Sequence, residues 1–373
     1  MAAVKYHDGG FPPARIDWAR LIPLIGPANA ALARYDGTLK GIPNAAVLLS
    51  PLMTQEAVLS SKIEGTQATM GEVLKFEAEG EQGSALGEDK RGDIEEVLNY
   101  REAMSRSVEL LKELPLCQRV VCEAHKVLLH GVRGQNKAPG DYRRVPNWIG
   151  TPGCSIEEAK YIPISADRLP EAMGAWEKYI HADAPDQLAK LAVLHAEFEA
   201  LHPFLDGNGR LGRMLVPLFM ARQGLLEKPM FYISAFFEKN REEYYERLLA
   251  VSRDGAWTAW VEFFLKAVID QAQENQKKAT AILDLYNISK ERFAVLTKSQ
   301  YSIRALDFVF HQPIFRSTNF VEKSRIPRPT AMRISKLLRD NKILVPLREG
   351  KGRREGILAF PALLRIVDGQ PAR

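Results

Sequence analysis

Apolar residues recur every three or four positions along much of the chain, which is the spacing that gives a helix one buried face. After an irregular N-terminal arm, this pattern predicts a short helix over roughly Ala28 to Tyr35. Ala78 to Asp93 is rich in glycine and acidic residues and is expected to be a solvated loop. Other apolar stripes predict helices from near Thr54 with a break at Gly65, from Ile94 to about Glu113, over Val120 to Leu129, up to about Leu201, from Asn208 or Gly209, and over Trp257 to Ala279.

The stretch from Arg133 to Pro163 holds too many glycine and proline residues for a helix. Two short extended runs, one around Trp148 and Ile149 and one at Tyr161, flank a polar segment that contains glycine. Such a pattern predicts a β-hairpin.

From Tyr301 the pattern changes. A helix over Ala305 to Phe310 precedes the segment Ser317 to Glu322, and a second helix follows over Thr330 to Asp340. Two extended runs, Ile343 to Val345 and Ile357 to Phe360, flank a basic tip over Glu349 to Arg354. This order of elements resembles a winged helix-turn-helix. The second helix turns Arg333, Lys336 and Arg339 outward, and such modules serve either DNA binding or protein docking.

The distribution of charge favours nucleic acid for that C-terminal region. The chain has 373 residues, enough to bury a full core and to hold more than one domain. Its net charge is +5, but residues 298–373 contain 16 basic and 6 acidic residues, a net of +10. The other residues contain 35 basic and 40 acidic side chains, a net of −5. A basic region of this kind is typical of nucleic-acid binding.

Several classes of protein are disfavoured. No apolar run reaches membrane-spanning length, since the stretch from Leu21 to Ala33 is interrupted by Pro23 and Pro27. The N-terminus lacks the apolar core of a secretory signal. The three cysteines are too few and wrongly spaced for a zinc site or a disulfide framework. A cytoplasmic protein without a membrane partner is expected.

The densest chemistry lies in His202-Pro-Phe-Leu-Asp-Gly-Asn-Gly-Arg-Leu-Gly-Arg213. Pro203 disfavours helical geometry at His202 and so ends the preceding helix near it. Gly207 and Gly209 allow backbone conformations that turn N–H groups inward around an anion. The helix that follows adds free N–H groups and the positive end of its dipole.

The charged residues of this stretch suit a nucleotide. Arg210 and Arg213 lie three positions apart on one helical face, so both can point at the same oligophosphate. Asp206 is placed to share a Mg²⁺ ion with those phosphates. Each feature alone is more often structural than functional, but the whole stretch matches the HPFx(D/E)GN(G/K)RxxR motif at every fixed position.

That motif identifies a resemblance to the Fic/Doc family of protein adenylyltransferases, and the resemblance covers most of the chain. It implies a mainly α fold, with a Fic helical core, a β-hairpin flap and a small C-terminal winged helix-turn-helix. The implied divisions are an N-terminal helical region over 1–112, with an inhibitory helix at about 54–66, a catalytic domain over 113–280, a linker helix over 281–300 and the winged helix over 301–373.

The resemblance also implies roles for individual residues. His202 is the expected general base, which takes the proton from a Tyr, Thr or Ser hydroxyl of a target protein, or of the chain itself, as that oxygen attacks the α-phosphorus of ATP. Asp206 is the expected Mg²⁺ ligand. The implied ATP contacts are Gly207, Asn208, Gly209, Arg210, Leu211, Gly212, Arg213, Tyr245 and, more weakly, Tyr244.

Two further segments acquire a role from the resemblance. Ser60-Ser-Lys-Ile-Glu64-Gly65 is similar to the (S/T)xxxE(G/N) pattern of the Fic inhibitory helix, in which Glu64 would compete for Arg213. Trp148, Ile149 and Gly150 are similar to the flap that docks the target. An edge strand there would align a target segment through backbone hydrogen bonds.

Alternatives remain open at this point. The transferred group is AMP, UMP or another nucleotide. The chain is alternatively a DNA-binding transcriptional regulator that uses the Fic core as a nucleotide sensor, or a toxin-type module. The identity of the target and the oligomeric state, including a homodimer, are also left open.

Overall fold

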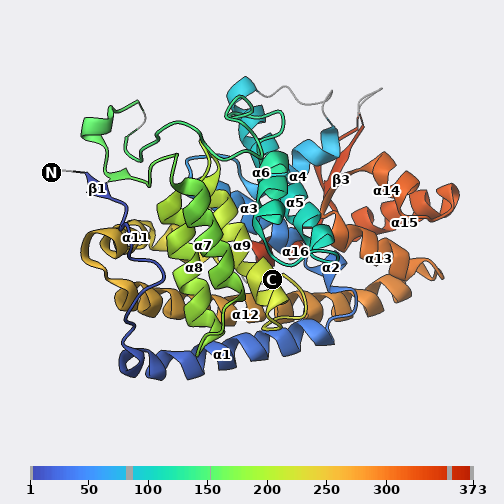
Figure 1. Ribbon diagram of the computed structural model, residues 1–373. Helices are drawn as coiled ribbons and strands as arrows, with labels where there is room; N and C mark the ends of the chain where they lie inside the picture. Colours follow the sequence, from blue (N-terminus) through green and yellow to red (C-terminus); the bar gives the residue numbers. More distant parts are fainter. Residues whose placement is uncertain (1–2, 81–86, 152, 351–354, 370–373) are drawn as a thin grey trace. The chain divides into compact units, whose positions relative to one another are not determined.

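The computed structural model describes residues 3–80, 87–151, 153–350 and 355–369 (Figure 1). Helices dominate these residues, so the prediction of a mainly α fold is confirmed. None of the described helices is long and apolar enough to cross a membrane. The chain forms two compact units: the first contains Met1–Asp36, Leu59–Thr66 and Leu98–Gln273, and the second contains Gly37–Val58, Gln67–Val97 and Glu274–Arg373.

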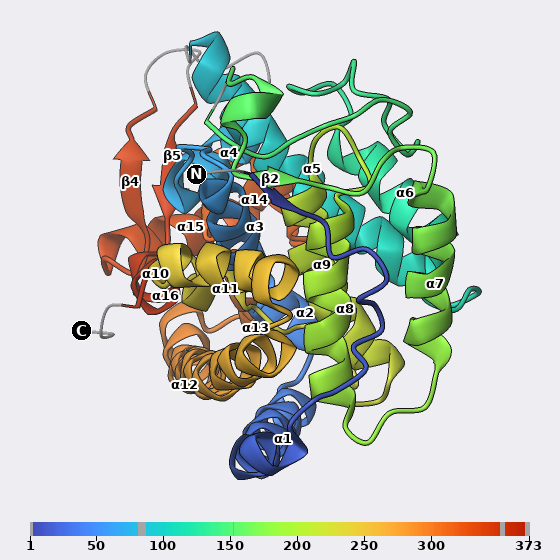
Figure 2. The same cartoon turned by 60° about the vertical axis from the view of Figure 1, so that its left-hand side comes forward.

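The first unit is built around α8 (Gln187–Leu201) and α9 (Asn208–Arg222), which pack against each other (Figure 2). Nearly every side chain of both helices is buried, including the polar Lys190, Glu197 and Arg213. Asp186 caps the start of α8, where its carboxylate accepts the Ala189 N–H at 2.8 Å. Around this pair lie α6 (Gln118–Leu128) against α9, and α7 (Leu169–His181) and α11 (Arg241–Asp254) against α8.

Four helices run from one unit into the other along the chain. They are α1 (Trp18–Gly41), α3 (Ser50–Ile63), α5 (Glu88–Leu110) and α12 (Trp257–Thr297). The helix predicted over Trp257 to Ala279 thus continues for several more turns. In the first unit, Trp260 anchors α12 because its indole N–H donates to the Ala192 carbonyl at 2.7 Å. The short α10 (Ser234–Lys239) completes the helices of this unit.

Helices α1 and α5 begin well before their predicted starts. The first, α1, begins ten residues before Ala28 and contains both Pro23 and Pro27. Proline inside a helix is costly, but the buried stripe that includes Leu21 and Leu32 outweighs that cost, because packing supplies most of the stability of a protein helix. The predicted loop over Ala78 to Asp93 is wrong at both ends. Helix α4 (Met70–Glu79) ends inside the predicted range, and α5 already begins at Glu88. Acidic residues in the first turn of α5 favour this early start, because they interact well with the positive end of the helix dipole. Residues 81–86 lie outside the described residues.

The predicted hairpin is reduced to one pair of residues. Ile149 and Tyr161 form a single antiparallel bridge, and the 3-10 turn η1 (Ile156–Glu158) lies in the connection. Strand β2 (Tyr161–Ile162) pairs instead in parallel with β1 (Val4–Lys5) from the N-terminal arm. A longer hairpin is disfavoured because Pro146 and Pro163 border the two runs and have no N–H to donate. The arm is not wholly irregular either, since Tyr6 and His7 both bond to the buried carboxylate of Glu197 on α8.

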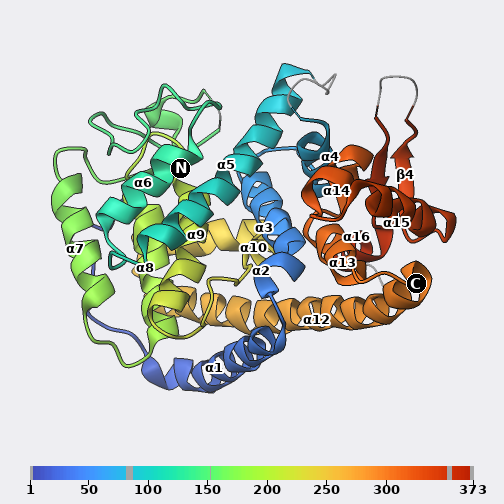
Figure 3. The same ribbon diagram turned by 90° about the vertical axis from the view of Figure 1, so that its right-hand side faces the viewer.

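The second unit contains an antiparallel sheet in the order β3-β5-β4, in which Phe315 is the register partner of Leu358. Figure 3 labels its strand β4. The sequence did not indicate β3 or α16, and it placed the first predicted strand slightly early. Otherwise the order of helices and strands is the one expected, while the winged-helix interpretation stays a prediction. Residues 351–354 of the basic tip lie outside the described part of the chain. Besides α4, the helices and strands that lie wholly in the second unit are α2 (Ala45–Leu48), α13 (Ser302–His311), β3 (Ile314–Arg316), α14 (Ser317–Lys323), α15 (Arg328–Asp340), β4 (Val345–Arg348), β5 (Ile357–Ala359) and α16 (Pro361–Val367).

Helix α4 packs on this sheet, mainly on β3. The carboxylate of Glu79, at the end of α4, pairs with the guanidinium of Arg348 on β4. Residues 67–97 therefore belong to the same compact unit as the C-terminal sheet, although they are far from it in sequence. Spacing along the chain gives no sign of this association.

We expect the start of α4 to be a local determinant of stability in the second unit. The Thr69 hydroxyl accepts the Glu72 N–H at 3.3 Å, while the Glu72 carboxylate accepts the Thr69 N–H at 2.9 Å, which is a capping box. Thr69→Ala should lower the free energy of unfolding by about 1 kcal/mol in urea titrations. Thr69→Ser keeps the hydroxyl and should stay within a few tenths of wild type. Equal losses in both variants would contradict a capping role.

Candidate active site

The site begins where α8 ends. His202 is the C-cap of α8 and adopts the left-handed conformation, with φ 46° and ψ 60°. This geometry is costly for a residue other than glycine and is held by its surroundings. Burial lowers the pKa of the His202 ring to about 4, in spite of the nearby carboxylates of Glu64 and Asp206. The ring is therefore neutral at neutral pH and can accept a proton.

The loop between α8 and α9 is locked from within. The buried Asn208 side chain accepts the Phe204 N–H and donates to the Phe204 carbonyl, both at 2.8 Å. Gly207, the N-cap of α9, has a φ of 77°, which a side chain would disfavour. Since the Asn208 amide is used inside the loop, only its backbone is available to an anion at the start of α9. The first N–H groups of a helix have no partner within it, so this end suits a phosphate.

His125 on α6 supports the same loop, and no sequence pattern marked it. Its Nδ1 accepts the Gly140 N–H at 2.9 Å, so its Nε2 carries the proton and donates to the Asp206 carbonyl at 3.0 Å. The ring stacks on Phe204, with 3.7 Å between ring centroids. Burial lowers the pKa of His125 to about 4, which matches a neutral ring that both donates and accepts.

Asp206 is the residue that suits a metal ion. Its side chain is 42% exposed, and its Oδ1 accepts the Gly207 N–H at 2.6 Å and lies 3.6 Å from a guanidinium nitrogen of Arg210. Within the described residues no three His, Cys, Asp or Glu side chains gather as a ligand set. Mg²⁺ in nucleotide sites is commonly held by one or two carboxylates together with substrate phosphates. A single exposed carboxylate beside the start of α9 fits that donor set.

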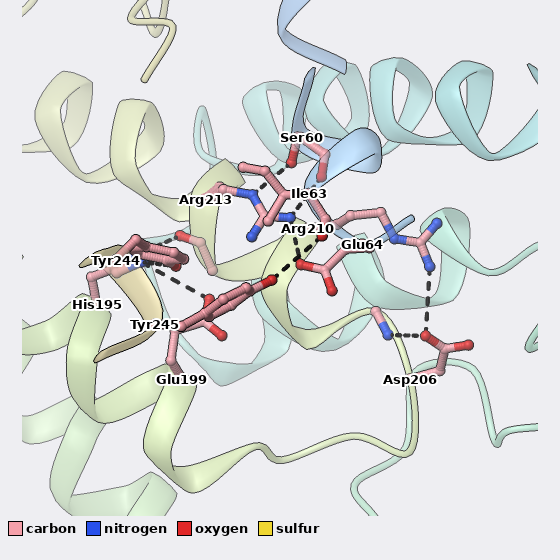
Figure 4. Close-up of polar contacts among 12 residues, drawn as sticks. Ser60, Ile63, Glu64, His195, Glu199, Asp206, Arg210, Arg213, Tyr244 and Tyr245 are labelled. Carbon is pink, nitrogen blue, oxygen red and sulfur yellow. Dashed lines mark hydrogen bonds and ion pairs between the residues drawn. The ribbon is translucent and has the colours of Figure 1, made fainter. Parts of the chain in front are cut away.

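Arg213 makes three hydrogen bonds to the segment 60–64 (Figure 4). Its guanidinium is about 1% exposed, and it donates to Ser60 Oγ at 3.0 Å, to the Ser60 carbonyl at 2.8 Å and to Glu64 Oε1 at 2.7 Å. Burial by itself would raise the pKa of Glu64, but Arg213 outweighs this effect and holds that pKa below its ordinary value. The structure thus brings two residues of the 60–65 segment onto one arginine of the motif.

Two glycines make this approach possible. A Cβ atom at Gly209 would lie 2.1 Å from Glu64 Oε1, so a side chain there would displace the carboxylate. Gly65 follows α3 with a φ of 104°, in the region that favours glycine. Glu64 therefore reaches the first turn of α9, the place where the positive end of a helix dipole favours an anion.

The two adjacent tyrosines on α11 differ in burial: Tyr244 lies in the core and Tyr245 is exposed. Tyr244 is 1% exposed, its hydroxyl bonds to His195 Nε2 at 2.9 Å, and its ring stacks on Phe237. Tyr245 is 38% exposed and its hydroxyl donates to the Ile63 carbonyl at 3.4 Å. Of the two rings, only that of Tyr245 has a face for a base to stack on. Leu211 is fully buried.

Glu199 is a further acid that the sequence did not single out. A Cβ atom at Gly212 would lie 2.3 Å from its Oε1, so this glycine lets the carboxyl sit against α9. Burial raises the pKa of Glu199 to about 8, while Arg213 opposes the increase. Glu199 is therefore largely protonated at neutral pH.

The flap residues face outward. Trp148 is 40% exposed and Ile149 is 38% exposed. The indole N–H of Trp148 donates to the Cys154 carbonyl at 2.9 Å, and a Cβ atom at Gly150 would lie 2.5 Å from Cys154 Sγ. The side chains of Trp148 and Ile149 are thus accessible within the first unit.

Family profiles match consecutive parts of the chain. The Fic/DOC family N-terminal profile matches residues 22–109, and the Fic/DOC family profile matches residues 115–220, which contain the whole motif. The chain belongs to the Fic/DOC family. Solved Fic structures share the fold: a Fic family protein from Desulfovibrio desulfuricans G20 superposes with a TM-score of 0.59 at 19% identity, over 93% of this chain and 98% of that one. Fic-1 from C. elegans gives a TM-score of 0.52 at 18% identity, over 70% and 76%.

Relatives with an assigned name match shorter regions. A probable protein adenylyltransferase from Aquifex aeolicus is 41% identical over 63 residues, 17% of either chain. The protein adenylyltransferase Fic of Drosophila grimshawi is 23% identical over 172 residues, 45% of this chain and 32% of that protein. The matched region thus spans a third or less of these relatives.

The buried neutral histidine at position 125 predicts a pH dependence of stability. Because the pKa of His125 is about 4 in the fold and about 6.5 when unfolded, unfolding takes up a proton between these values. Its contribution is complete above about pH 6.5 and is lost toward pH 4, by about 3 kcal/mol at most. The stability difference between wild type and His125→Gln should therefore shrink as the pH falls.

Urea titrations between about pH 7 and pH 4.5 measure this difference. His181→Gln, at an exposed histidine on α7, is the matched control. If His125→Gln keeps the wild-type pH dependence of stability, the proton assignment is wrong.

Proposed function

We propose that this Fic protein transfers AMP from ATP to a hydroxyl group of a protein. The observation that carries the proposal is the meeting of three features at one helix end: a neutral His202, the N-terminal turn of α9 and the buried guanidinium of Arg213. Together they offer a proton acceptor beside a seat for an oligophosphate. The names of the relatives from Aquifex and Drosophila agree with this reaction.

In the proposed reaction His202 removes the proton from a Tyr, Thr or Ser hydroxyl. The hydroxyl oxygen forms a bond to the α-phosphorus of ATP, the bond to the bridging oxygen breaks, and pyrophosphate leaves with the electron pair. The backbone of Gly207, Asn208 and Gly209 orients the phosphates, while Arg210 and Arg213 balance the charge that develops. Mg²⁺, held by Asp206 and phosphate oxygens, would neutralise further charge when bound.

The remaining residues set specificity. Tyr245 is the proposed contact of the base, because its ring is accessible and Tyr244 is enclosed in the core. Trp148, Ile149 and Gly150 form the proposed docking edge for the target segment. Because backbone hydrogen bonds make little demand on sequence, this edge would fix the position of a hydroxyl rather than select a motif.

We further propose that Glu64 inhibits the transfer. A carboxylate on Arg213 takes the guanidinium that would otherwise bind the terminal phosphate, and it lies where an anion would sit, against Gly209. ATP bound beside it would place its α-phosphorus off the line of attack. A displacement of about 1 Å can cost roughly a hundredfold in rate.

Glu64→Gly should therefore raise the labelling of proteins by α-³²P-ATP, in a lysate and on the chain itself, by about tenfold or more. Adding His202→Ala to this variant should lower the labelling by about a hundredfold or more, because general bases contribute about 10²–10⁴. Lys62→Gly is the matched control: it places a glycine two residues earlier, in the last turn of α3, and removes the pair with Glu238 instead of the pair with Arg213. Labelling that does not rise in a folded Glu64→Gly protein would refute the inhibition.

Thermal unfolding offers a second readout of the same variant. Glu64→Gly leaves Arg213 buried with one partner fewer, at a cost of about 1–3 kcal/mol. ATP with Mg²⁺ should restore that loss, because a ligand of the folded state stabilises it. A smaller stabilisation by ATP in Glu64→Gly than in wild type would argue against a shared site.

A second candidate function, independent of the first, is the binding of double-stranded DNA by α15. Arg328, Lys336 and Arg339 are exposed along this helix. Arg333 is partly engaged, since its guanidinium donates to the Thr297 carbonyl at 3.0 Å. A row of cations on one helix face matches the charge of a phosphate backbone.

Fluorescence anisotropy with a labelled duplex tests this interpretation. The pair Lys336→Glu, Arg339→Glu should weaken binding by about tenfold or more at low salt, and affinity should fall steeply as salt increases. The control pair Lys178→Glu, Lys266→Glu makes the same charge change on exposed residues of the first unit. Equal affinity for all three proteins would exclude α15, and a protein partner would become the better account.

A further inference from the structure

The backbone around the expected base has an unusual set of partners. The last carbonyls of a helix lack N–H donors within it and need donors from elsewhere. Here five consecutive carbonyls, from Ala200 to Phe204, accept hydrogen bonds from the segment 143–161, which precedes and contains the docking edge. Because one segment donates to every carbonyl of this turn, we expect the segment and the turn to act together.

Arg143 donates to three of these five carbonyls. Its Nε donates to the His202 carbonyl at 2.9 Å, its Nη2 donates to the Leu201 carbonyl at 3.2 Å and to the Ile164 carbonyl, and its backbone N–H donates to the Pro203 carbonyl at 2.9 Å. The side chain is 3% exposed. A cation at the end of α8 is also favoured by the negative end of the helix dipole.

Asn147 and Tyr161 complete the set. Asn147 Nδ2 lies 3.1 Å from the Phe204 carbonyl and 3.4 Å from that of His202, and the Tyr161 hydroxyl donates to the Ala200 carbonyl at 3.0 Å. Both residues are tied to the docking edge: Asn147 precedes Trp148 in the chain, and Tyr161 pairs with Ile149. The same residues thus hold the edge and the turn that carries His202.

We propose that Arg143 and Asn147 are positioning residues, which hold His202 in its left-handed conformation and fix its distance from the docking edge. This inference rests on the proposed transfer reaction and deepens it. A target hydroxyl placed by the edge would meet the imidazole only while this frame is intact. Neither side chain touches ATP in the proposed arrangement, so their loss should affect the rate and not nucleotide binding.

Arg143 should also influence the titration of His202. The charged groups that act on the ring are Glu64 and Asp206, which raise its pKa, and Arg143, which lowers it together with burial. Removal of the guanidinium should therefore raise the pKa of His202 toward the ordinary value of about 6.5. The acid limb of the rate profile should move to higher pH. Arg143→Lys keeps the charge but cannot form the forked bonds, so it should lower the rate with little change in this limb.

The test uses the full chain with Glu64→Gly as the reference, to which Arg143→Met, Arg143→Lys and Asn147→Ala are added singly. We expect kcat to fall by about tenfold to a hundredfold in each, with the Kd for ATP, from calorimetry, within about twofold of the reference. Arg144→Met is the matched control, because this neighbour is exposed and makes none of these bonds. A kcat within about twofold of the reference in folded Arg143→Met and Asn147→Ala would overturn the proposal.

A second measurement does not depend on transfer. Titration of the His202 ring by NMR, assigned with His202→Ala, should show a higher pKa in Arg143→Met than in the reference and an unchanged pKa in Arg144→Met. If the reference labels no protein, the proposed function fails, while the NMR titration still decides whether Arg143 acts on His202. If Arg143→Met does not fold, Arg143→Lys and Asn147→Ala are used for the test instead. A loss of ATP affinity as large as the loss of kcat would mean that these residues have a merely structural role.

Discussion

The desolvation of one guanidinium constrains the whole candidate site. Arg213 lies almost completely out of water, and a buried cation without partners would be very costly. Ser60 and Glu64 supply those partners, so the end of α3 is held against α9 by the needs of this arginine. The same guanidinium suits a phosphate oxygen equally well. One buried charge thus links the stability of the resting protein to the binding of its proposed substrate.

A second constraint is the neutrality of the surrounding side chains. His125, His195 and His202 all have a lowered pKa, because burial disfavours the charged form of each ring. Glu199 has a raised pKa for the same reason. Burial thus keeps these four side chains largely neutral at neutral pH. In such a setting Arg213 and the start of α9 act on an anion with little screening by water.

The structure also shows how the expected base is held by residues outside the motif. His202 takes a conformation that its own sequence disfavours, and the bonds from Arg143 and Asn147 hold the backbone there. Local strain of this kind persists only where the surroundings fix it. The docking edge and the base share this support, which gives the proposed coupling a physical basis.

The sequence by itself determined the features that depend on neighbours in the chain. The break of α8 at His202 follows from Pro203, and the start of α9 follows from the glycine at 207, because proline and glycine act on their own backbone. The fixed spacing of the motif likewise indicated which residues gather at that helix end. The apolar stripes indicated a mainly α fold. Helix α1 nevertheless continues past two prolines that predicted an interruption, because its buried side chains stabilise it.

Only the tertiary structure decided what depends on distant neighbours. His125 and Arg143 are ordinary residues in the sequence, and they become part of the site because folding brings α6 and the segment before the docking edge onto the motif loop. The sequence could not show that Tyr244 is enclosed while Tyr245 is accessible, since adjacent positions differ only in what packs on them. Nor could it show that α4 packs on the C-terminal sheet. Such contacts depend on how the packed elements meet, and no local pattern records them.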